Sequence, residues 1–366
     1  MSNFASLVFY FVTFGIAIVA FSYYKDKNIT IAKIGLTVAV LIPTFVAGFR
    51  YMVGTDYDVY YYTFRTDLPN SSYSWILTDS RHLNMERVFL VISKFITSIL
   101  GAKGTFGFFA FIIVLLFIFT LIKQYKRINI VLPFFLFLMG PYMASYNILR
   151  QSIALIIAFW GCQFVFEGNI KKYFYTVICA SCFHFSAILS LPIYLLWNHR
   201  KKTDLNALKK LLLLIIAICF VLTWRPLLMW FGTLTQISSI TKYTRYLSAE
   251  NTFNRSFYLK LFWGILFFLF KKRYINCDRR FALFINMYVI GVILEYTGFY
   301  TPYIKRISNY YSLYTEVMLI GTFPMIFRIK TNRNIVRICT IFYEYALFFV
   351  VSFLMKQGKY FPYRIG

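Results

Sequence analysis

The amino-acid sequence predicts an all-α, polytopic transmembrane helix bundle. The chain is 60% hydrophobic and 22% aromatic, and only 14% of its residues are charged, whereas a soluble domain carries roughly a quarter charged residues. Long apolar runs of about 15–23 residues recur along the chain, and this length crosses a hydrocarbon core of roughly 30 Å. Lys and Arg gather in short clusters between these runs, as they do in membrane proteins.

Ten apolar runs are long enough to be predicted as membrane-spanning helices. The first is expected to be a retained span, because it lacks a basic leader and a small-residue cleavage site. Two further stretches, 86–100 and 172–197, resist simple assignment, so we expect about 11–13 membrane segments, some short or broken. The ten runs are 4–22, 31–48, 105–122, 130–146, 148–166, 209–231, 256–270, 281–299, 307–327 and 338–355.

The basic clusters predict the orientation, because cytoplasmic loops are enriched in Lys and Arg. KK at 171–172 and HRKK at 199–202 flank 172–197, so this stretch should leave and re-enter on one side, as two short helices that turn near His184. We expect a single integral membrane domain over 1–366. Its extracytoplasmic loop, 49–104, is expected to contain a re-entrant or amphipathic helix at 86–100; a full span there would place KQYKR (123–127) outside.

The net charge of +26 does not indicate nucleic acid, since no continuous basic face is visible. No phosphate-binding loop, dinucleotide fingerprint or zinc-protease motif occurs. Cys179 and Cys182 form a CxxC, but their apolar flanks are those of a buried helix. The sequence therefore predicts no metal site and no cofactor.

Two pairs of polar residues begin apolar helices on the predicted outer side. Arg150 and Gln151 follow the breaker pair Gly140-Pro141, and Lys305 and Arg306 precede the 307–327 run. A guanidinium near a helix N-terminus suits phosphate or diphosphate, because the planar fork and the dipole both favour anions. The alternatives are an arginine that reaches the lipid headgroups and an ordinary interfacial anchor.

Acids are scarce in this chain, yet several lie at the predicted outer boundary together with one histidine. A carboxylate or a neutral imidazole there would accept a proton or bind a sugar hydroxyl, and aromatic rings beside carboxylates suit carbohydrate. The alternatives are a solvated loop with internally paired acids, a helix-start residue and a packed core histidine. The candidate acids are Asp56, Asp58 and Glu86, and the histidine is His184. Tyr57 and Tyr60 are the neighbouring aromatic residues, and Arg50 is the nearby cation.

Five segments, taken in order, resemble the EpsG family of Wzy-like polysaccharide polymerases. They are FRYMVGTDYDVYYYTF (49–64), NMERVFLVISKF (84–95), YNILRQSIALIIAFWG (146–161), FHFSAILSLPIYLL (183–196) and IKRISNYYSLYTEVMLIGTFP (304–324). The resemblance covers about 45–325. One departure is visible, since Met85 and Arg87 flank Glu86 where the family often has an acid–Pro–Gly step; this puts the local turn in doubt.

The resemblance implies a glycosyltransferase of the bacterial plasma membrane with a GT-C-like architecture. Such enzymes join oligosaccharide repeat units carried on undecaprenyl pyrophosphate at the outer face, for capsule, O-antigen or exopolysaccharide. The scheme requires no metal or nucleotide, and it implies a flippase and a chain-length regulator as further partners. Asp56, Asp58, Glu86 or His184 would supply the base, Arg50, Arg150, Gln151, Lys305 and Arg306 would bind the diphosphate region, and Tyr57 and Tyr60 would line the sugar path.

Three other functions remain open from the residues alone. A transporter or flippase for a lipid-linked oligosaccharide would use a similar cationic cavity, but it is expected to show related halves. A membrane sugar O-acyltransferase would use His184 within the membrane. A scaffold for a synthesis complex would need none of the charged residues.

Overall fold

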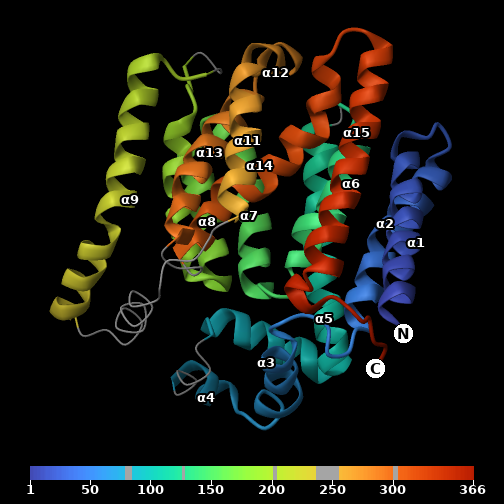
Figure 1. The fold of residues 1–366 in the computed structure, drawn as a ribbon. Helices are drawn as coiled ribbons and strands as arrows, with labels where there is room; N and C mark the ends of the chain where they lie inside the picture. The colour runs from blue at the N-terminus through green and yellow to red at the C-terminus, as the bar shows by residue number, and fades with distance from the viewer. Residues whose placement is uncertain (79–84, 126–127, 201–203, 236–254, 300–303) are drawn as a thin grey trace. The chain divides into compact units, whose positions relative to one another are not determined.

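The computed structural model of the protein describes residues 1–78, 85–125, 128–200, 204–235, 255–299 and 304–366 (Figure 1). Regular structure in these ranges is entirely helical, and an isolated β-bridge joins Arg50 to Ile365. The chain forms two compact units. Unit 1 comprises Met1–Gly161, Phe174–Ile188 and Ile320–Gly366, and unit 2 comprises Cys162–Tyr173 and Leu189–Leu319.

The predicted all-α polytopic bundle is confirmed. Within the described ranges, five helical segments are long and apolar enough to cross a membrane: Asn3–Lys25, Ile29–Gly48, Arg87–Tyr125, Leu149–Glu167 and Lys330–Leu354. Shorter apolar helices cover Val131–Tyr142, Phe185–Leu196 and Phe281–Glu295. Most of the ten predicted runs therefore coincide with observed helices to within a few residues.

Unit 1 holds the N-terminal and C-terminal helices (Figure 1). Its elements are α1 (Asn3–Ser22), α2 (Ile29–Gly48), α3 (Tyr57–Tyr62), α4 (Tyr73–Thr78), α5 (Arg87–Tyr125), α6 (Val131–Phe137), η4 (Leu138–Tyr142), α7 (Leu149–Glu167, up to Gly161), α8 (Ile170–Phe183, from Phe174) and α15 (Lys330–Phe348) followed by η10 (Phe349–Leu354). The last helix begins eight residues before the predicted run at 338, because its polar first turns, with Arg333 bonded to the Phe327 carbonyl, continue beyond the apolar stretch.

Side-chain caps begin α1 and α2, and a glycine lets these two helices pack closely. Ser2 accepts the Ala5 N–H at 3.1 Å at the start of α1, and Asn28 accepts the Thr30 N–H at 2.9 Å at the start of α2, so free N–H groups of both helices are satisfied. A Cβ on Gly35 would lie 2.4 Å from the Ala20 carbonyl oxygen. The two helices can approach this closely only because position 35 lacks a side chain.

Helix α5 bends sharply at Gly101, whose φ of 67° and ψ of 179° are not helical. In a straight helix Thr97 and Thr105, eight positions apart, would be about 12 Å apart along the axis. Their hydroxyl oxygens are instead 2.9 Å apart, so the helix folds back on itself. The arm 102–125 is about 36 Å long and can cross a bilayer, whereas the arm 87–100 is too short.

The arm 87–100 is amphipathic. Phe89 and Leu90 are fully buried, and Phe89 packs against the rings of Tyr60 and Phe64. The opposite face exposes Phe95 and Ile99, which are apolar side chains suited to lipid. A re-entrant or amphipathic placement of 86–100 in the membrane remains a prediction.

The chain is also broken at His184, as the sequence predicts. Helix α8 ends at Phe183, His184 is not helical, and the short helix η5 (Phe185–Leu196) begins immediately after it. The His184 N–H still bonds the Ala180 carbonyl, and the His184 carbonyl accepts the Ala187 N–H at 2.9 Å. The break therefore turns the chain without leaving these backbone groups unsatisfied.

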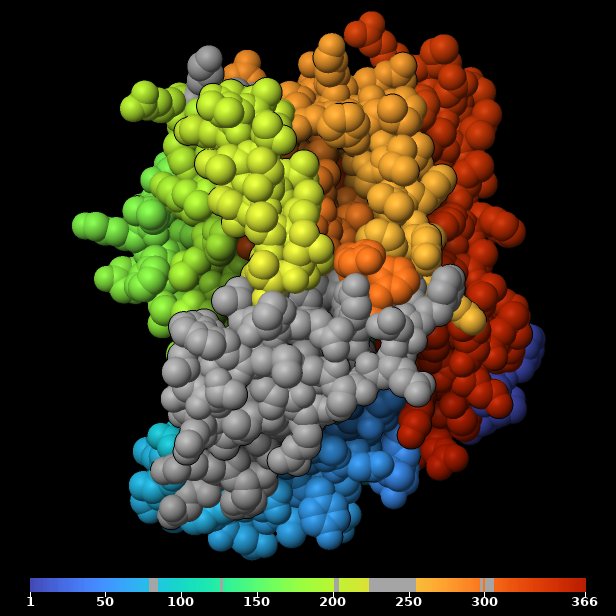
Figure 2. Space-filling model, turned by 60° about the vertical axis from the view of Figure 1, so that its left-hand side comes forward, coloured from blue at the N-terminus to red at the C-terminus, as the bar shows by residue number. Residues whose placement is uncertain are grey.

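Unit 2 is built from α9 (Ala207–Thr235), α11 (Arg255–Leu269), α12 (Lys271–Cys277), α13 (Phe281–Glu295), η8 (Ile304–Ser308) and α14 (Asn309–Leu319, the part in this unit). Helices α9 and α11 both pack against α13, and Figure 2 shows the surface that α9 (yellow-green) and α11 (light orange) present. A Cβ on Gly291 would lie 2.8 Å from the Ser312 Cβ, so α13 and α14 are in close contact.

Candidate functional site

Three predicted site residues, distant in sequence, meet in unit 1. Glu86 Oε2 is ion-paired with Arg150 Nη1, and Glu86 Oε1 lies 2.9 Å from His184 Nδ1. The Phe185 N–H donates to the same Oε1 at 3.1 Å. Both carboxylate oxygens are thus engaged, and we call Glu86, Arg150 and His184 the Glu86 centre.

Each member of the Glu86 centre lies where a helix begins or breaks. Glu86 precedes α5, and its carbonyl accepts the Leu90 N–H at 3.1 Å. Arg150 is the second residue of α7, which follows the turn at 142–147. His184 occupies the break between α8 and η5. At a helix end, some backbone N–H and C=O groups have no partner within the helix and can bind polar side chains. The same helix ends therefore position the polar residues that form the site.

The Glu86 centre is partly open to solvent. The side chains of Glu86 and Arg150 are each 19% exposed, and that of His184 is 23% exposed. Burial alone would raise the pKa of the Glu86 carboxyl, but the hydrogen bond with His184 and the positive charge of Arg150 outweigh it, so the pKa is lowered from its ordinary value. Glu86 is therefore a carboxylate near neutral pH.

Tyr60 extends the Glu86 centre on the side of the predicted sugar path. Its hydroxyl accepts a hydrogen bond from Arg150 Nε at 3.3 Å. Burial raises the Tyr60 pKa, and the nearby Arg150 charge only partly opposes this. Tyr60 consequently keeps its proton and can donate to an incoming oxygen.

The acids of the opening motif differ in their surroundings. Asp56 immediately precedes α3, is half-buried, and accepts a hydrogen bond from the Thr55 hydroxyl at 3.0 Å. Asp58 is exposed in the first turn of α3. Tyr57 is fully buried against Phe106, with ring centroids 5.1 Å apart. A role of these residues in catalysis or sugar binding remains a prediction.

Arg50 is buried, with 2% of its surface exposed, beneath aromatic rings. Its guanidinium carbon lies 3.9 Å from the centroid of Tyr146 and 4.8 Å from that of Phe106. In the described part of the chain no carboxylate pairs with it. These contacts are cation–π interactions that hold the end of α2 in place, and direct diphosphate binding by Arg50 remains a prediction.

Asn147 is a framework residue that the sequence reasoning missed. Its side-chain oxygen accepts the Thr55 N–H at 2.6 Å, and its amide donates to the Tyr360 hydroxyl at 3.1 Å. The C-terminal segment 359–366 is bonded to the same loop, since the Gly54 N–H donates to the Lys359 carbonyl at 2.9 Å. The sequence signal for this role was limited to the polar residue at position 147, just before Leu149-Arg150.

The other predicted cations lie in unit 2. Lys305 and Arg306 fall within η8, and the side chain of Lys305 lies outside the described residues. Gln151 is in unit 1 and is buried, with 3% of its surface exposed. The expected meeting of Arg306 with Arg150 and His184 thus remains a prediction, while the meeting of Arg150 with His184 at Glu86 is observed.

Unit 2 contains a largely buried ion pair that the sequence reasoning also missed. Glu295 accepts from Lys260 Nζ at 2.8 Å, from Ser256 at 2.5 Å and from Ser308. Lys260 also donates to Ser312 at 3.0 Å. The sequence signal for this pair was a single base and a single acid, each within an apolar run. The pair ties η8, which carries Lys305 and Arg306, to α13.

The described residues include no group of three His, Cys, Asp or Glu side chains placed to hold a metal ion. Metal independence of the chemistry stays a prediction, based on the cations of the protein itself.

The family model for EpsG matches residues 33–365, nearly the whole chain. The chain belongs to the EpsG family. This confirms the resemblance seen in the five motifs and makes the protein a multi-pass membrane protein of a Wzy-like polymerase family, which supports a polysaccharide polymerase-type function. No curated protein and no solved structure matches the chain. In this EpsG-family protein, the Glu86 centre draws one residue from each of three of the five motifs.

Proposed function

We propose that the protein is a glycosyltransferase that polymerises oligosaccharide repeat units linked to undecaprenyl pyrophosphate. It would act at the outer face of the bacterial plasma membrane, in capsule, O-antigen or exopolysaccharide synthesis. Family membership supports polymerase-type chemistry in general, and the Glu86 centre is the observation that carries the specific proposal. Its members supply a positioned base, an orienting carboxylate and a fixed cation.

His184 is the proposed general base. Because Glu86 is ionised, the nitrogen that faces it, Nδ1, carries the imidazole proton, which leaves Nε2 with a lone pair. The carboxylate then stabilises the imidazolium that forms when Nε2 takes a proton, as in other carboxylate–histidine pairs. Glu86 orients the base and is not itself the acceptor of the substrate proton. This choice narrows the four candidate bases of the sequence to one.

Arg150 is the proposed cation for the leaving group. A sugar diphosphate gains negative charge on its bridging oxygen as the glycosidic bond breaks, and a fixed positive charge nearby lowers that barrier. Arg150 is held by Glu86 and Tyr60, so its position does not have to be organised during the reaction. With His184 neutral, the charges of Glu86 and Arg150 cancel. Proton transfer to His184 makes the centre net positive as the diphosphate leaves.

The reaction balances without a redox partner. The acceptor hydroxyl oxygen forms a bond to the anomeric carbon of the donor chain, and the bond from that carbon to the diphosphate oxygen breaks. The hydroxyl proton goes to His184 Nε2, and the electron pair goes to the diphosphate. Tyr60 is placed to donate a hydrogen bond along this path.

The decisive experiment gives the purified full chain a lipid-linked repeat unit and separates the products by size. We expect a ladder of oligomers. A single unchanged band from folded protein would overturn the polymerase proposal and favour a flippase, whereas the mass gain of one acyl group would favour an acyltransferase.

Substitutions in the Glu86 centre test the assigned roles in the same assay. Arg150→Ala and His184→Gln should each lower ladder formation by about 100-fold or more, as expected for loss of a fixed cation or of a general base. Arg65→Ala is the matched control, because Arg65 is exposed and donates a hydrogen bond to the Tyr61 hydroxyl at 2.9 Å, away from the Glu86 centre. Wild-type chain lengths from Arg150→Ala would remove Arg150 from the mechanism.

A further inference from the structure

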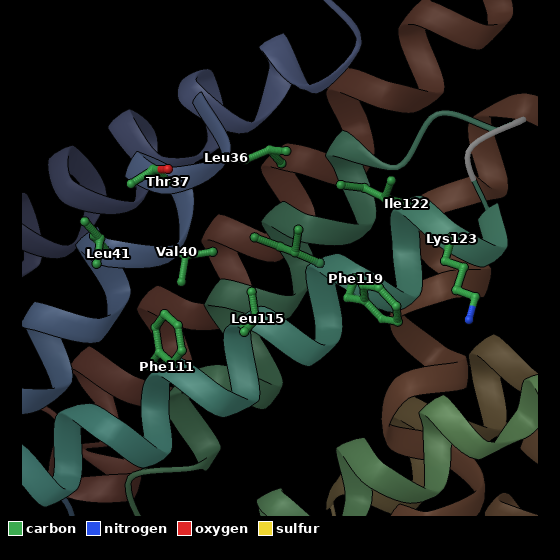
Figure 3. Close-up of a pocket in the computed structure, with 10 residues that line it drawn as sticks. Leu36, Thr37, Val40, Leu41, Phe111, Leu115, Phe119, Ile122 and Lys123 are labelled. Carbon is green, nitrogen blue, oxygen red and sulfur yellow. The ribbon is translucent and has the colours of Figure 1, made fainter. Parts of the chain in front are cut away.

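Unit 1 contains an apolar groove between α2 and α5, remote in sequence from the Glu86 centre. Its volume is about 430 Å³. Figure 3 shows that its walls come from one face of each helix, with Val40 opposite Phe111 and Leu115. We call this the α2–α5 groove; its lining is Leu36, Thr37, Val40, Leu41, Phe111, Leu115, Ile118, Phe119, Ile122 and Lys123.

Helices α2 and α5 are in close contact at Gly48 and Gly107. A Cβ on Gly48 would lie 3.4 Å from the Gly107 Cα, and one on Gly107 would lie 3.6 Å from the Gly48 Cα. Larger side chains separate the helices further along, where Leu36 and Ile122 lie. The two helices are therefore in contact through small residues near Gly48, whereas larger side chains line the groove towards Lys123.

Lipid is the only solvent available to this groove in a multi-pass membrane protein. Leu41, Leu115 and Phe119 are 36%, 39% and 46% exposed, so the groove opens on the outside of the helix pair. Apolar walls offer water no hydrogen bonds, whereas an acyl chain packs against them without losing any. A flexible acyl chain fits a narrow channel between two helices better than a rigid group does.

The charge at the open end indicates which lipid binds there. Lys123 lines the groove, and its ammonium lies 5.3 Å from the centroid of the Phe119 ring. Lys33 is exposed and lies three and four residues before Leu36 and Thr37, on the same face of α2. Two lysines thus stand at the same end of the groove, and no acidic residue is among its lining. A headgroup phosphate complements this pair.

We propose that the α2–α5 groove binds one acyl chain of an anionic phospholipid, with Lys33 and Lys123 at its headgroup. The basic residues Lys25 and Lys27 flank the same end of α2, which the sequence predicts to be cytoplasmic. The site is therefore assigned to the leaflet opposite the proposed reaction. It does not depend on the polymerase proposal.

The test measures lipid retention by the detergent-purified full chain by native mass spectrometry. Phosphatidylglycerol and phosphatidylcholine with identical acyl chains are compared, so only the headgroup charge differs. The double variant Lys33→Gln/Lys123→Gln should bind phosphatidylglycerol about thirtyfold more weakly, because each lysine contributes a factor of roughly five. The matched control, Lys25→Gln/Lys27→Gln, removes the same charge next to α2 but away from the groove lining.

A second variant tests the groove itself. Leu115→Trp fills the channel and should reduce retention of both lipids, while an unchanged melting temperature shows that the bundle is intact. Equal retention of the two lipids, an equal loss in both lysine variants, or wild-type retention by Leu115→Trp would each overturn the proposal. Displacement of bound phosphatidylglycerol by equimolar undecaprenyl phosphate would also overturn it, because the groove would then be a polyprenyl site.

Discussion

Glu86 is the acceptor at which three segments of unit 1 converge. One oxygen binds Arg150, and the other accepts from His184 and the Phe185 N–H. An unpaired carboxylate that is only 19% exposed would be costly to desolvate, so the hydrogen bonds to both oxygens explain how an acid is retained at position 86. The same contacts leave a defined imidazole nitrogen for chemistry.

Glu86→Gln gives a pH-dependent prediction at the residue scale. The folded pKa of Glu86 is lowered, so its ionisation stabilises the protein above the unfolded pKa of about 4.5, and this stabilisation is lost as the pH falls through the lower folded value. The wild type should therefore melt above Glu86→Gln at pH 7, and the gap should shrink as the pH falls below about 4.5.

Thermal melts of detergent-purified protein across this pH range provide the measurement. Asp58→Asn is the control, because Asp58 is an exposed acid in the first turn of α3. A gap between wild type and Glu86→Gln that stays constant from pH 7 to pH 3 would contradict the assigned ionisation.

At the scale of the element, the bend in α5 decides where Glu86 stands. A straight helix of 39 residues would extend about 58 Å and carry its first residues far beyond the bilayer. The bend returns the arm 87–100 towards α3, where Phe89 packs against Tyr60. Glu86 is thereby held beside the helix that provides Tyr60.

Gly101→Ala should destabilise the protein by about 1–3 kcal/mol, because its backbone conformation is accessible essentially only to glycine. Space is not the reason, since nothing lies within 4 Å of a Cβ built at position 101. Gly15→Ala is the matched control: Gly15 also has open space around it but no positive φ. This control should be neutral or slightly stabilising.

Chemical or thermal unfolding of the two variants separates the effect of backbone conformation on stability from the effect of side-chain packing. Similar stability of Gly101→Ala and Gly15→Ala would show that the bend is not required. A loss of polymer ladder in Gly101→Ala that exceeds its loss of folded protein would tie the bend to the position of Glu86.

At the scale of the whole molecule, the lysine-rich connections predict the orientation in the membrane. Lys27 lies in the exposed α1–α2 connection, and Asn70 is exposed in the 49–104 segment. Both would be converted singly to cysteine in a background without the six native cysteines. An impermeant maleimide should label Asn70→Cys in intact cells and Lys27→Cys only after permeabilisation. The reverse pattern would place the Glu86 centre in the cytoplasm and contradict the proposed site of synthesis.

The sequence by itself determined the fold class and most helix positions, because both follow from local composition. Runs such as 31–48 and 281–299 have the length and hydropathy that lipid requires, and α2 and α13 were found there. The break at His184 was also predictable, since basic clusters flank the stretch on both sides. Arg150, Glu86 and His184 were recognisable as candidates because charged groups are scarce in the chain.

Only the tertiary structure decided which candidates contact one another. Spacing along the chain carries no information on whether Glu86 meets Arg150, 64 residues away, or His184, 98 residues away. Nor does spacing along the chain predict the buried, aromatic-lined position of Arg50, the bridge made by Asn147 or the Lys260–Glu295 pair. Desolvation and hydrogen-bond geometry act between segments that packing brings together, so the roles of these residues emerged only once the helices were placed.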